Sequence, residues 1–230
     1  MAKILRNAGS YRILAIMYPP TKFTPLELIE LAGRTAYQSQ DKITKNSAER
    51  FVKMLRDRGH ESVLEHSAMT VEFNNVSRGF THELVRHRLA SFTQESTRYV
   101  DESDFIVVCP PDKDPDEPCI KLSINTPEIF ASSSISFRQW MDLNEQVYRS
   151  LRKAGWVPED ARQVLPTAIK SQIVITANFR EWRHILRLRT SLKAHWEIRA
   201  VMTKLLKELK ATVPVVFDDI LAGEEHEEDQ

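Results

Sequence analysis

The chain is organised around residues 86–99, which read RHRLASFTQESTRY. The stretch opens with two arginines around a histidine and closes, after hydroxyl, amide and carboxylate groups, with Arg98. Arginine presents a planar fork of N–H donors that matches phosphate oxygens, and Ser96 and Thr97 add hydroxyl groups. The same cations could instead merely complement a helix C-terminus, which contributes about 0.3–1 kcal/mol each. The stretch therefore indicates either an anion site or a helix end.

The order Arg-His-Arg, seven residues, Ser runs from Arg86 to Ser96 and resembles the signature of the flavin-dependent thymidylate synthases. Further segments between Gly59 and Trp196 resemble the same family: Gly59–His66, Arg162 with Val164–Pro166, Asn178 with Arg180, and Leu188 with Arg189. The resemblance implies the thymidylate synthase-complementing fold.

Composition limits the class of protein. The chain has 230 residues, 42% hydrophobic and 28% charged, with a formal net charge of zero. Zero net charge gives no general attraction to nucleic acid, so an anion site must come from local clustering. No apolar run reaches the roughly 18 residues that span a bilayer, and the N-terminus lacks a signal peptide pattern. Cys109 and Cys119 are not spaced as a metal-binding pair, so we expect both to be free thiols in a reducing compartment. Together these features predict a soluble cytoplasmic protein with no membrane partner.

Helix and strand patterns alternate irregularly along the chain. We expect helices near residues 24–37, 46–59, 77–88, 127–154, 158–166, 178–189 and 194–209, and strands near 69–73 and 105–108 and around 173–175. This pattern predicts an α+β fold, a single domain over residues 1–222 with a modest, mainly antiparallel sheet and a large helical layer. Residues 223–230 are predicted to be an acidic disordered tail.

Local signals fix several helix starts. Thr24 with Glu27, and Asn178 with Glu181, have the spacing of an N-cap residue and its acidic partner, and Asn46 is a third candidate cap. His60 and His66 are six residues apart, which is wrong for a zinc-binding helix face, so no metal site is expected. The chain has six glycines and no Gly-x-Gly-x-x-Gly pattern, which excludes a Rossmann-type flavin domain.

The expected helix at 178–189 carries a second cluster of cations. Trp182, Ile185, Leu186 and Arg189 share one face, so Arg189 lies in line with an apolar stripe and needs an anion, a polar ligand or a cavity. Arg180 and His184 share a different face, whereas Arg183 and Arg187 are expected on a solvated surface. A DNA-recognition helix is disfavoured because the apolar stripe leaves little of the helix free for a groove.

The resemblance implies roles for individual residues. Residues implied in binding FAD are Ser62, Arg86, His87, Arg88, Gln94, Asn178, Arg180 and His184. Residues implied in binding dUMP are Glu83, Leu84, Val85, Arg86, Gln94, Glu95, Ser96, Thr97, Arg98, Arg162 and Arg189. Ser62, Glu83 and Thr97 stand where the family commonly has Thr, Gln and Gly. A carboxylate at Glu83 would repel a phosphate unless it pairs with Arg86.

Methylation at C5 of uracil requires that carbon to become a nucleophile. Neither cysteine is flanked by a His or Arg that would activate a thiolate, so we expect Arg189, which stays protonated, to stabilise charge developing on the ring. The resemblance implies reductive methylation of dUMP to dTMP, with FAD as cofactor, 5,10-methylenetetrahydrofolate as carbon donor and NADPH as reductant. It also implies a homotetramer with active sites shared between subunits. The alternative is a non-enzymatic nucleotide- or nucleic-acid-binding module that uses the same arginines.

Overall fold

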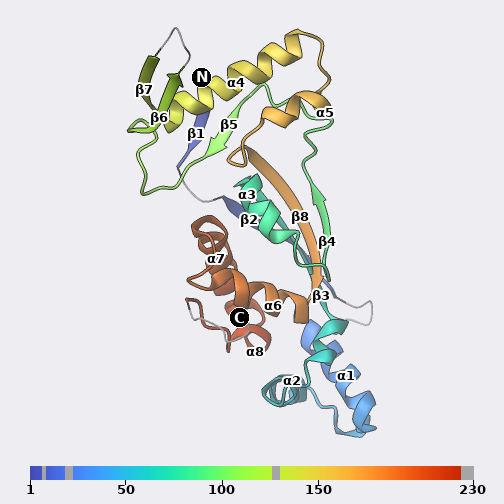
Figure 1. Ribbon diagram of the computed structural model, residues 1–230. Coiled ribbons are helices and arrows are strands. Elements are labelled where there is room, and N and C mark those ends of the chain that lie inside the picture. The colour runs from blue at the N-terminus through green and yellow to red at the C-terminus, as the bar shows by residue number, and fades with distance from the viewer. Residues whose placement is uncertain (7–8, 19–22, 126–129, 224–230) are drawn as a thin grey trace. The chain divides into compact units, whose positions relative to one another are not determined.

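The computed structural model describes residues 1–6, 9–18, 23–125 and 130–223 (Figure 1). The chain forms two compact units. Unit 1 comprises Met1–Gly9, Asn75–Thr81 and Gln94–Gln172, and unit 2 comprises Ser10–Asn74, His82–Thr93 and Ile173–Gln230. Of the predicted acidic tail at 223–230, residues 224–230 lie outside the described residues. Across the ranges that the structure describes, no helix has the length and apolarity needed to cross a membrane.

The largest sheet has four strands. In the spatial order β2-β3-β8-β4, they are Ser10–Ile16, Ala68–Ser77, Lys170–Asn178 and Ser91–Gln94. β2 and β3 are antiparallel, with a register shift between Ile13 and Ala15. Alternate residues of β3, including Val71 and Phe73, are buried, as expected for a strand with one face against a core. This mixture of helices and antiparallel strands confirms the predicted α+β class, and β3 and β8 confirm two predicted strands.

Among the described residues, unit 2 has four helices that the sequence predicts, near 24–37, 46–59, 178–189 and 194–209, and three short ones that it does not predict. They are α1 (Pro25–Tyr37), η1 (Gln40–Lys42), α2 (Ser47–Asp57), η2 (Glu61–His66), α6 (Phe179–Thr190), α7 (Trp196–Thr212) and α8 (Pro214–Phe217). Thr24 and Glu27 form the expected capping box of α1. Asn46 lies at the N-cap of α2, but its side chain makes no capping bond, and the Ser47 hydroxyl accepts from the Thr44 N–H at 2.9 Å instead.

Helix α6 carries the second cation cluster and is fixed by its apolar stripe. The Asn178 side chain caps it by accepting from the Glu181 N–H at 2.9 Å, as predicted. Trp182, Ile185 and Leu186 are fully buried, and the indole of Trp182 donates to the Met69 carbonyl of β3 at 3.0 Å. Figure 1 shows α6 grouped with α7 and α8. The orientation of α6 about its own axis is therefore set by packing.

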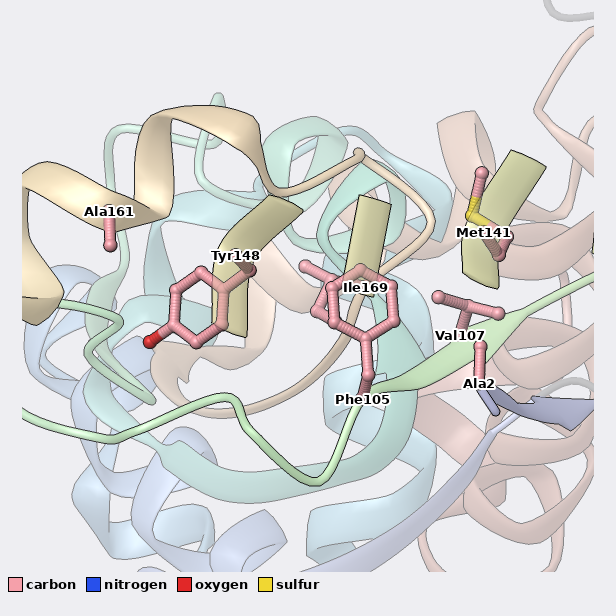
Figure 2. Packing of buried hydrophobic residues seen from close by; sticks show 7 residues of the cluster. All are labelled: Ala2, Phe105, Val107, Met141, Tyr148, Ala161 and Ile169. Atoms are coloured by element: carbon pink, nitrogen blue, oxygen red, sulfur yellow. The ribbon is translucent and has the colours of Figure 1, made fainter. Parts of the chain in front are cut away.

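Unit 1 has its own hydrophobic core. Its elements are β1 (Lys3–Leu5) parallel to β5 (Ile106–Val108), β6 (Pro118–Asn125) antiparallel to β7 (Phe130–Ser136), α4 (Phe137–Lys153), α5 (Pro158–Ala161) and η3 (Arg162–Val164). The core cluster contains Ala2, Phe105, Val107, Met141, Tyr148, Ala161 and Ile169 (Figure 2). Each of these residues is at most 3% exposed, so α4 is held against β1 and β5 by apolar burial.

The predicted helix over 127–154 is wrong in its first third. Residues 130–136 form strand β7, which pairs with β6 in a hairpin, and residues 126–129 lie outside the described part of the chain. Helix α4 starts only at Phe137, where Ser136 and Gln139 form a capping box. The sequence before Ser136 is rich in serine, which favours caps and extended backbone over a helix interior, and this explains the late start.

Candidate active site

Helix α3 (Arg78–Leu84) ends two residues before Arg86, so the predicted helix over 77–88 is too long and the Arg-His-Arg segment lies outside it. Its first turn is capped by the Ser77 hydroxyl, which accepts from the Phe80 N–H at 3.0 Å. After Leu84 the chain turns, and the His87 N–H donates to the Leu84 carbonyl at 3.2 Å. Arg86 and Arg88 are exposed on this turn, whereas the His87 side chain is buried. We call residues 85–90 the arginine turn.

The arginine turn and α6 enclose a cavity of about 1000 Å³. Its lining residues are Glu61, Glu65, Arg86, His87, Arg88, Leu89, Asn178, Arg180, Glu181, His184 and Arg187. Six of the eight residues implied in flavin binding therefore meet at one cavity within unit 2. Ser62, on η2, and Gln94, in unit 1, are not among the lining residues.

The cavity has a surplus of unpaired positive charge. Arg180 pairs with Glu65 at 2.6 Å, and Arg187 pairs with Glu61 at 3.3 Å. Among the described residues, no carboxylate pairs with Arg86 or Arg88. Two exposed guanidinium groups on one turn, facing a cavity this large, offer donors that match a diphosphate. The residues present therefore fit a dinucleotide cofactor.

His87 is held neutral in this setting. Its pKa is lowered to about 3 by burial first, and then by the nearby charges of Arg189, His184 and Arg86. The Nε2 atom accepts from Nε of Arg189 at 3.0 Å, and Nδ1 lies 3.7 Å from Oε1 of Glu181. The His184 ring contacts the His87 ring edge to face, with centroids 5.5 Å apart. Burial raises the pKa of Glu181.

Arg189 meets the expectation that an arginine in line with an apolar stripe needs polar partners. Its Nη1 donates to Oε2 of Glu83 and its Nη2 to the Glu83 carbonyl, both at 3.0 Å. A second cavity of about 490 Å³ lies here, lined by Arg86, His87, His184, Leu188, Arg189, Lys193 and Ala194. Glu83 thus pairs with Arg189, whereas the sequence suggested Arg86. The reason is that α3 ends before Arg86, which leaves that side chain on the exposed turn.

The remaining residues implied in dUMP binding divide between the units. In unit 1, the Gln94 amide donates to the hydroxyls of Thr81 at 2.8 Å and Ser171 at 3.2 Å, and Glu95 pairs with Lys170 at 3.2 Å. Arg98 pairs with Glu159 at 2.8 Å, and Arg162 donates to the Glu159 carbonyl at 3.0 Å. The Ser96 hydroxyl accepts from the Arg98 N–H at 3.3 Å, and Thr97 is buried. In unit 2, Leu84 is fully buried and Val85 is exposed on the arginine turn.

The prediction of a solvated Arg183 is wrong. Its side chain is 1% exposed and binds both carboxylate oxygens of Asp219, at 2.6 and 2.7 Å, together with Glu61 and the Val216 carbonyl. These acceptors come from η2 and from the segment around α8, so nothing near Arg183 in sequence indicates them. Glu61, Glu65, Glu181 and Arg187 line the large cavity without having been implied as ligands. The sequence holds signals for three of them, since Glu61 and Glu65 lie in the Gly59–His66 segment that carries the family resemblance and Arg187 lies three residues after His184 on the same helix.

Comparison with known proteins supplies the context for this geometry. The family described as "Thymidylate synthase complementing protein" matches residues 21–215. The flavin-dependent thymidylate synthases of Mycolicibacterium vanbaalenii and Corynebacterium diphtheriae are each 38% identical over 196 residues. These alignments cover 84% of this chain and 78% and 77% of the relatives.

Two solved structures share the fold. Thymidylate synthase X from Helicobacter pylori, with FAD and dUMP, has a TM-score of 0.67 and 21% identity, covering 93% of this chain and 99% of that one. The UMP/dUMP methylase PolB from Streptomyces cacaoi, bound with 5-Br dUMP, has a TM-score of 0.70 and 21% identity, covering 94% and 95%.

Proposed function

Because the chain belongs to the family of flavin-dependent thymidylate synthases, which are methyltransferases, we propose its complete reaction and the residues that perform it. The reaction is the reductive methylation of dUMP to dTMP, with 5,10-methylenetetrahydrofolate as carbon donor and NADPH as reductant. The cofactor is FAD, which when bound supplies hydride transfer.

The observation that carries the proposal is the large cavity beside the arginine turn. Arg86 and Arg88 project from the turn without a carboxylate partner among the described residues, and the neutral His87 lies between them. A cofactor diphosphate would be held by the two arginines, with Asn178, Arg180 and His184 around the rest of the cavity. Ser62 and Gln94 are the two further candidates, and they lie outside this set of lining residues.

For dUMP we propose two groups of residues. Gln94, Glu95, Ser96, Thr97, Arg98 and Arg162 would bind the phosphate and sugar, and Glu83, Leu84, Val85, Arg86 and Arg189 would surround the base. Arg98 and Arg162 both contact Glu159 in the structure, so a bound phosphate would compete with that residue. Leu84 would contribute through its backbone because its side chain is fully buried.

The chemistry assigned to Arg189 follows from its surroundings. Burial raises the pKa of the Cys109 thiol, which disfavours the thiolate that a covalent route needs. An arginine keeps its charge even when partly buried, so Arg189 is suited to stabilise negative charge that develops on the uracil ring. Fixed donors avoid the cost of reorganising at the moment of reaction, and the bonds to Glu83 and His87 fix Arg189.

We also propose a homotetramer in which subunits share active sites, as the family resemblance implies. A single chain of this size has limited concave surface for three large ligands, and Trp140, Leu143 and Val147 leave an exposed apolar row along α4. Cys109 and Cys119 are both free thiols, which is compatible with the cytoplasm.

The test is a reconstituted assay. Purified protein should absorb in the visible range as a flavoprotein, and should convert dUMP to dTMP when both the folate and NADPH are present. Omitting either co-substrate should abolish product. A colourless protein that forms no dTMP and binds DNA or RNA with steep salt dependence would instead support the nucleic-acid-binding alternative.

A further inference from the structure

Within the arginine turn, His87 differs from its two arginine neighbours. Its side chain is 3% exposed, and its Nε2 atom accepts a hydrogen bond from Arg189, whereas Nδ1 lies 3.7 Å from Oε1 of Glu181, which is longer than a hydrogen bond. The Nε group of arginine is always a donor, so Nε2 of His87 must be the acceptor and carries no proton. The proton of the neutral ring is therefore on Nδ1, on the side that faces Glu181.

We propose that His87 is a positioning residue, which orients Arg189 through the lone pair on Nε2. This inference rests on the proposed function, in which Arg189 faces the uracil ring. The guanidinium has an acceptor on each of its three nitrogens: His87 Nε2 on Nε, Glu83 Oε2 on Nη1 and the Glu83 carbonyl on Nη2. Three such bonds from two directions define the plane of the group, which a single ion pair would leave free to rotate.

Burial first, and then the charges around His87, keep the ring neutral. Arg189, Arg86 and His184 disfavour an imidazolium, whereas Glu181 and Glu83 are the acidic groups nearby. A proton on Nε2 would turn that atom into a donor, and the bond from Arg189 would be lost. With a pKa of about 3, His87 keeps its acceptor throughout the neutral range. The His87 side chain therefore accepts a hydrogen bond from Arg189 and carries no charge. On the arginine turn, the positive charge that faces the large cavity comes from Arg86 and Arg88.

The experiment compares two replacements of His87 that differ in what they offer Arg189. His87→Gln places an amide oxygen at a reach similar to that of Nε2, and the amide can accept a hydrogen bond. His87→Met has a similar length and no comparable acceptor, and His87→Asn, whose amide is too short to reach, is the substitute if the Met variant does not fold. His82→Gln, at an exposed position of α3, is the matched control.

Each variant is measured in three ways: FAD content by absorbance, dUMP affinity by calorimetry on the flavin-loaded protein, and turnover between pH 6 and 8. His87→Met should bind dUMP about ten- to a hundredfold more weakly, the range for a hydrogen bond to a charged group, with FAD content unchanged. His87→Gln should recover to within about threefold of the wild type. Equal loss in the Gln and Met variants, or loss of FAD in place of dUMP affinity, would overturn the proposal. Failure of the proposed function would appear separately, as no dTMP from the wild type.

Discussion

Two of the four arginines of helix α6, Arg183 and Arg189, lie six residues apart in clusters of opposite character. Arg183 is 1% exposed and its acceptors are the carboxylates of Glu61 and Asp219 and the Val216 carbonyl. The Arg189 side chain is 18% exposed beside a cavity, and one of its acceptors is a neutral imidazole. Both guanidinium groups are well satisfied, so hydrogen bonding alone does not separate them.

The difference lies in what each cluster joins. Arg183 ties α6 to η2 and to the segment after α8, where Arg56 also pairs with Asp218 and Asp219. Nothing in this cluster requires a ligand. Arg189 joins α6 to the end of α3 through Glu83, and it also lines the cavity of about 490 Å³. We therefore assign a structural role to Arg183 and a chemical one to Arg189, and the following changes test that division.

The largest effect on stability is expected from Arg183→Met. The substitution removes the buried guanidinium that binds Asp219, Glu61 and the Val216 carbonyl, while Arg56 and Arg187 still contact the two carboxylates, so the expected cost is about 3 kcal/mol, the lower end of the range for breaking a buried ion pair. Urea denaturation at fixed protein concentration measures this loss. The control is Arg12→Met, because the Arg12 side chain is 69% exposed and its pair with Glu72 should contribute about 1 kcal/mol or less. Similar losses in the two variants would contradict the structural role of Arg183.

The next effect concerns the unpaired cations of the arginine turn. Arg86→Gln and Arg88→Gln should each weaken FAD binding by about 1.5–3 kcal/mol, because a charge-assisted bond to the cofactor phosphates is lost. Fluorescence titration of FAD into the stripped protein measures the affinity, and the unfolding free energy should change little. If FAD affinity matched that of the wild type in both variants, the large cavity would not be the cofactor site.

The carboxylate of Glu102 in unit 1 differs from the Arg183 cluster because, in the part of the chain that the structure describes, it is buried without a hydrogen-bond partner for one of its oxygens. Glu102 is 6% exposed, and its Oε1 has no hydrogen-bond partner among the described residues. Burial and then the charge of Glu95 raise its pKa from 4.5 to about 7. Between these values the folded protein binds more protons than the unfolded chain, so this contribution to stability is lost as the pH rises through the window.

Glu102→Gln should remove that dependence. The variant should gain about 1–3 kcal/mol over the wild type at pH 8 and show little difference at pH 4.5, because one pKa unit corresponds to about 1.4 kcal/mol. Denaturation curves across this pH range measure the gain, and Glu117→Gln, at an exposed position, is the control. A gain that is the same at both pH values would show that protonation of Glu102 is not its cause.

The smallest effect is expected from Arg187→Gln. Arg187 shares Glu61 with Arg183 but is one-third exposed, so its pair should contribute about 0.2–1 kcal/mol. Thermal unfolding of this variant and of Arg183→Met compares the contributions of the two arginines that pair with Glu61. If Arg187→Gln lost as much unfolding free energy as Arg183→Met, the exposed pair of Arg187 with Glu61 would matter as much as the buried bonds of Arg183.

The sequence predicts the parts of the fold that local rules control. The capping box at Thr24, the N-cap bond at Asn178 and the apolar stripe of α6 depend on residues within two turns, and each is found in the structure. The stripe also indicates that Arg189 needs partners. The partners themselves, Glu83 and His87, are more than 100 residues away in the chain, so only the fold brings them together.

The failures share this cause. Arg183 looks solvated because Asp219 lies 36 residues further on, beyond α7. Strands β2, β4, β6 and β7 are not predicted: β4 has only four residues, β7 is rich in serine, and β2 and β6 are defined by the strands with which they pair. The Arg-His-Arg stretch is predicted as an anion site, whereas the burial of its central histidine follows from the turn after α3.

The division between the two arginines is tested most directly by one comparison of turnover per bound flavin, the wild type against Arg189→Ala. The account predicts that both proteins carry FAD and unfold alike, while dTMP formation by the variant falls about a hundred- to a thousandfold, the range for removing one transition-state donor. Equal turnover per flavin in the two proteins would contradict it.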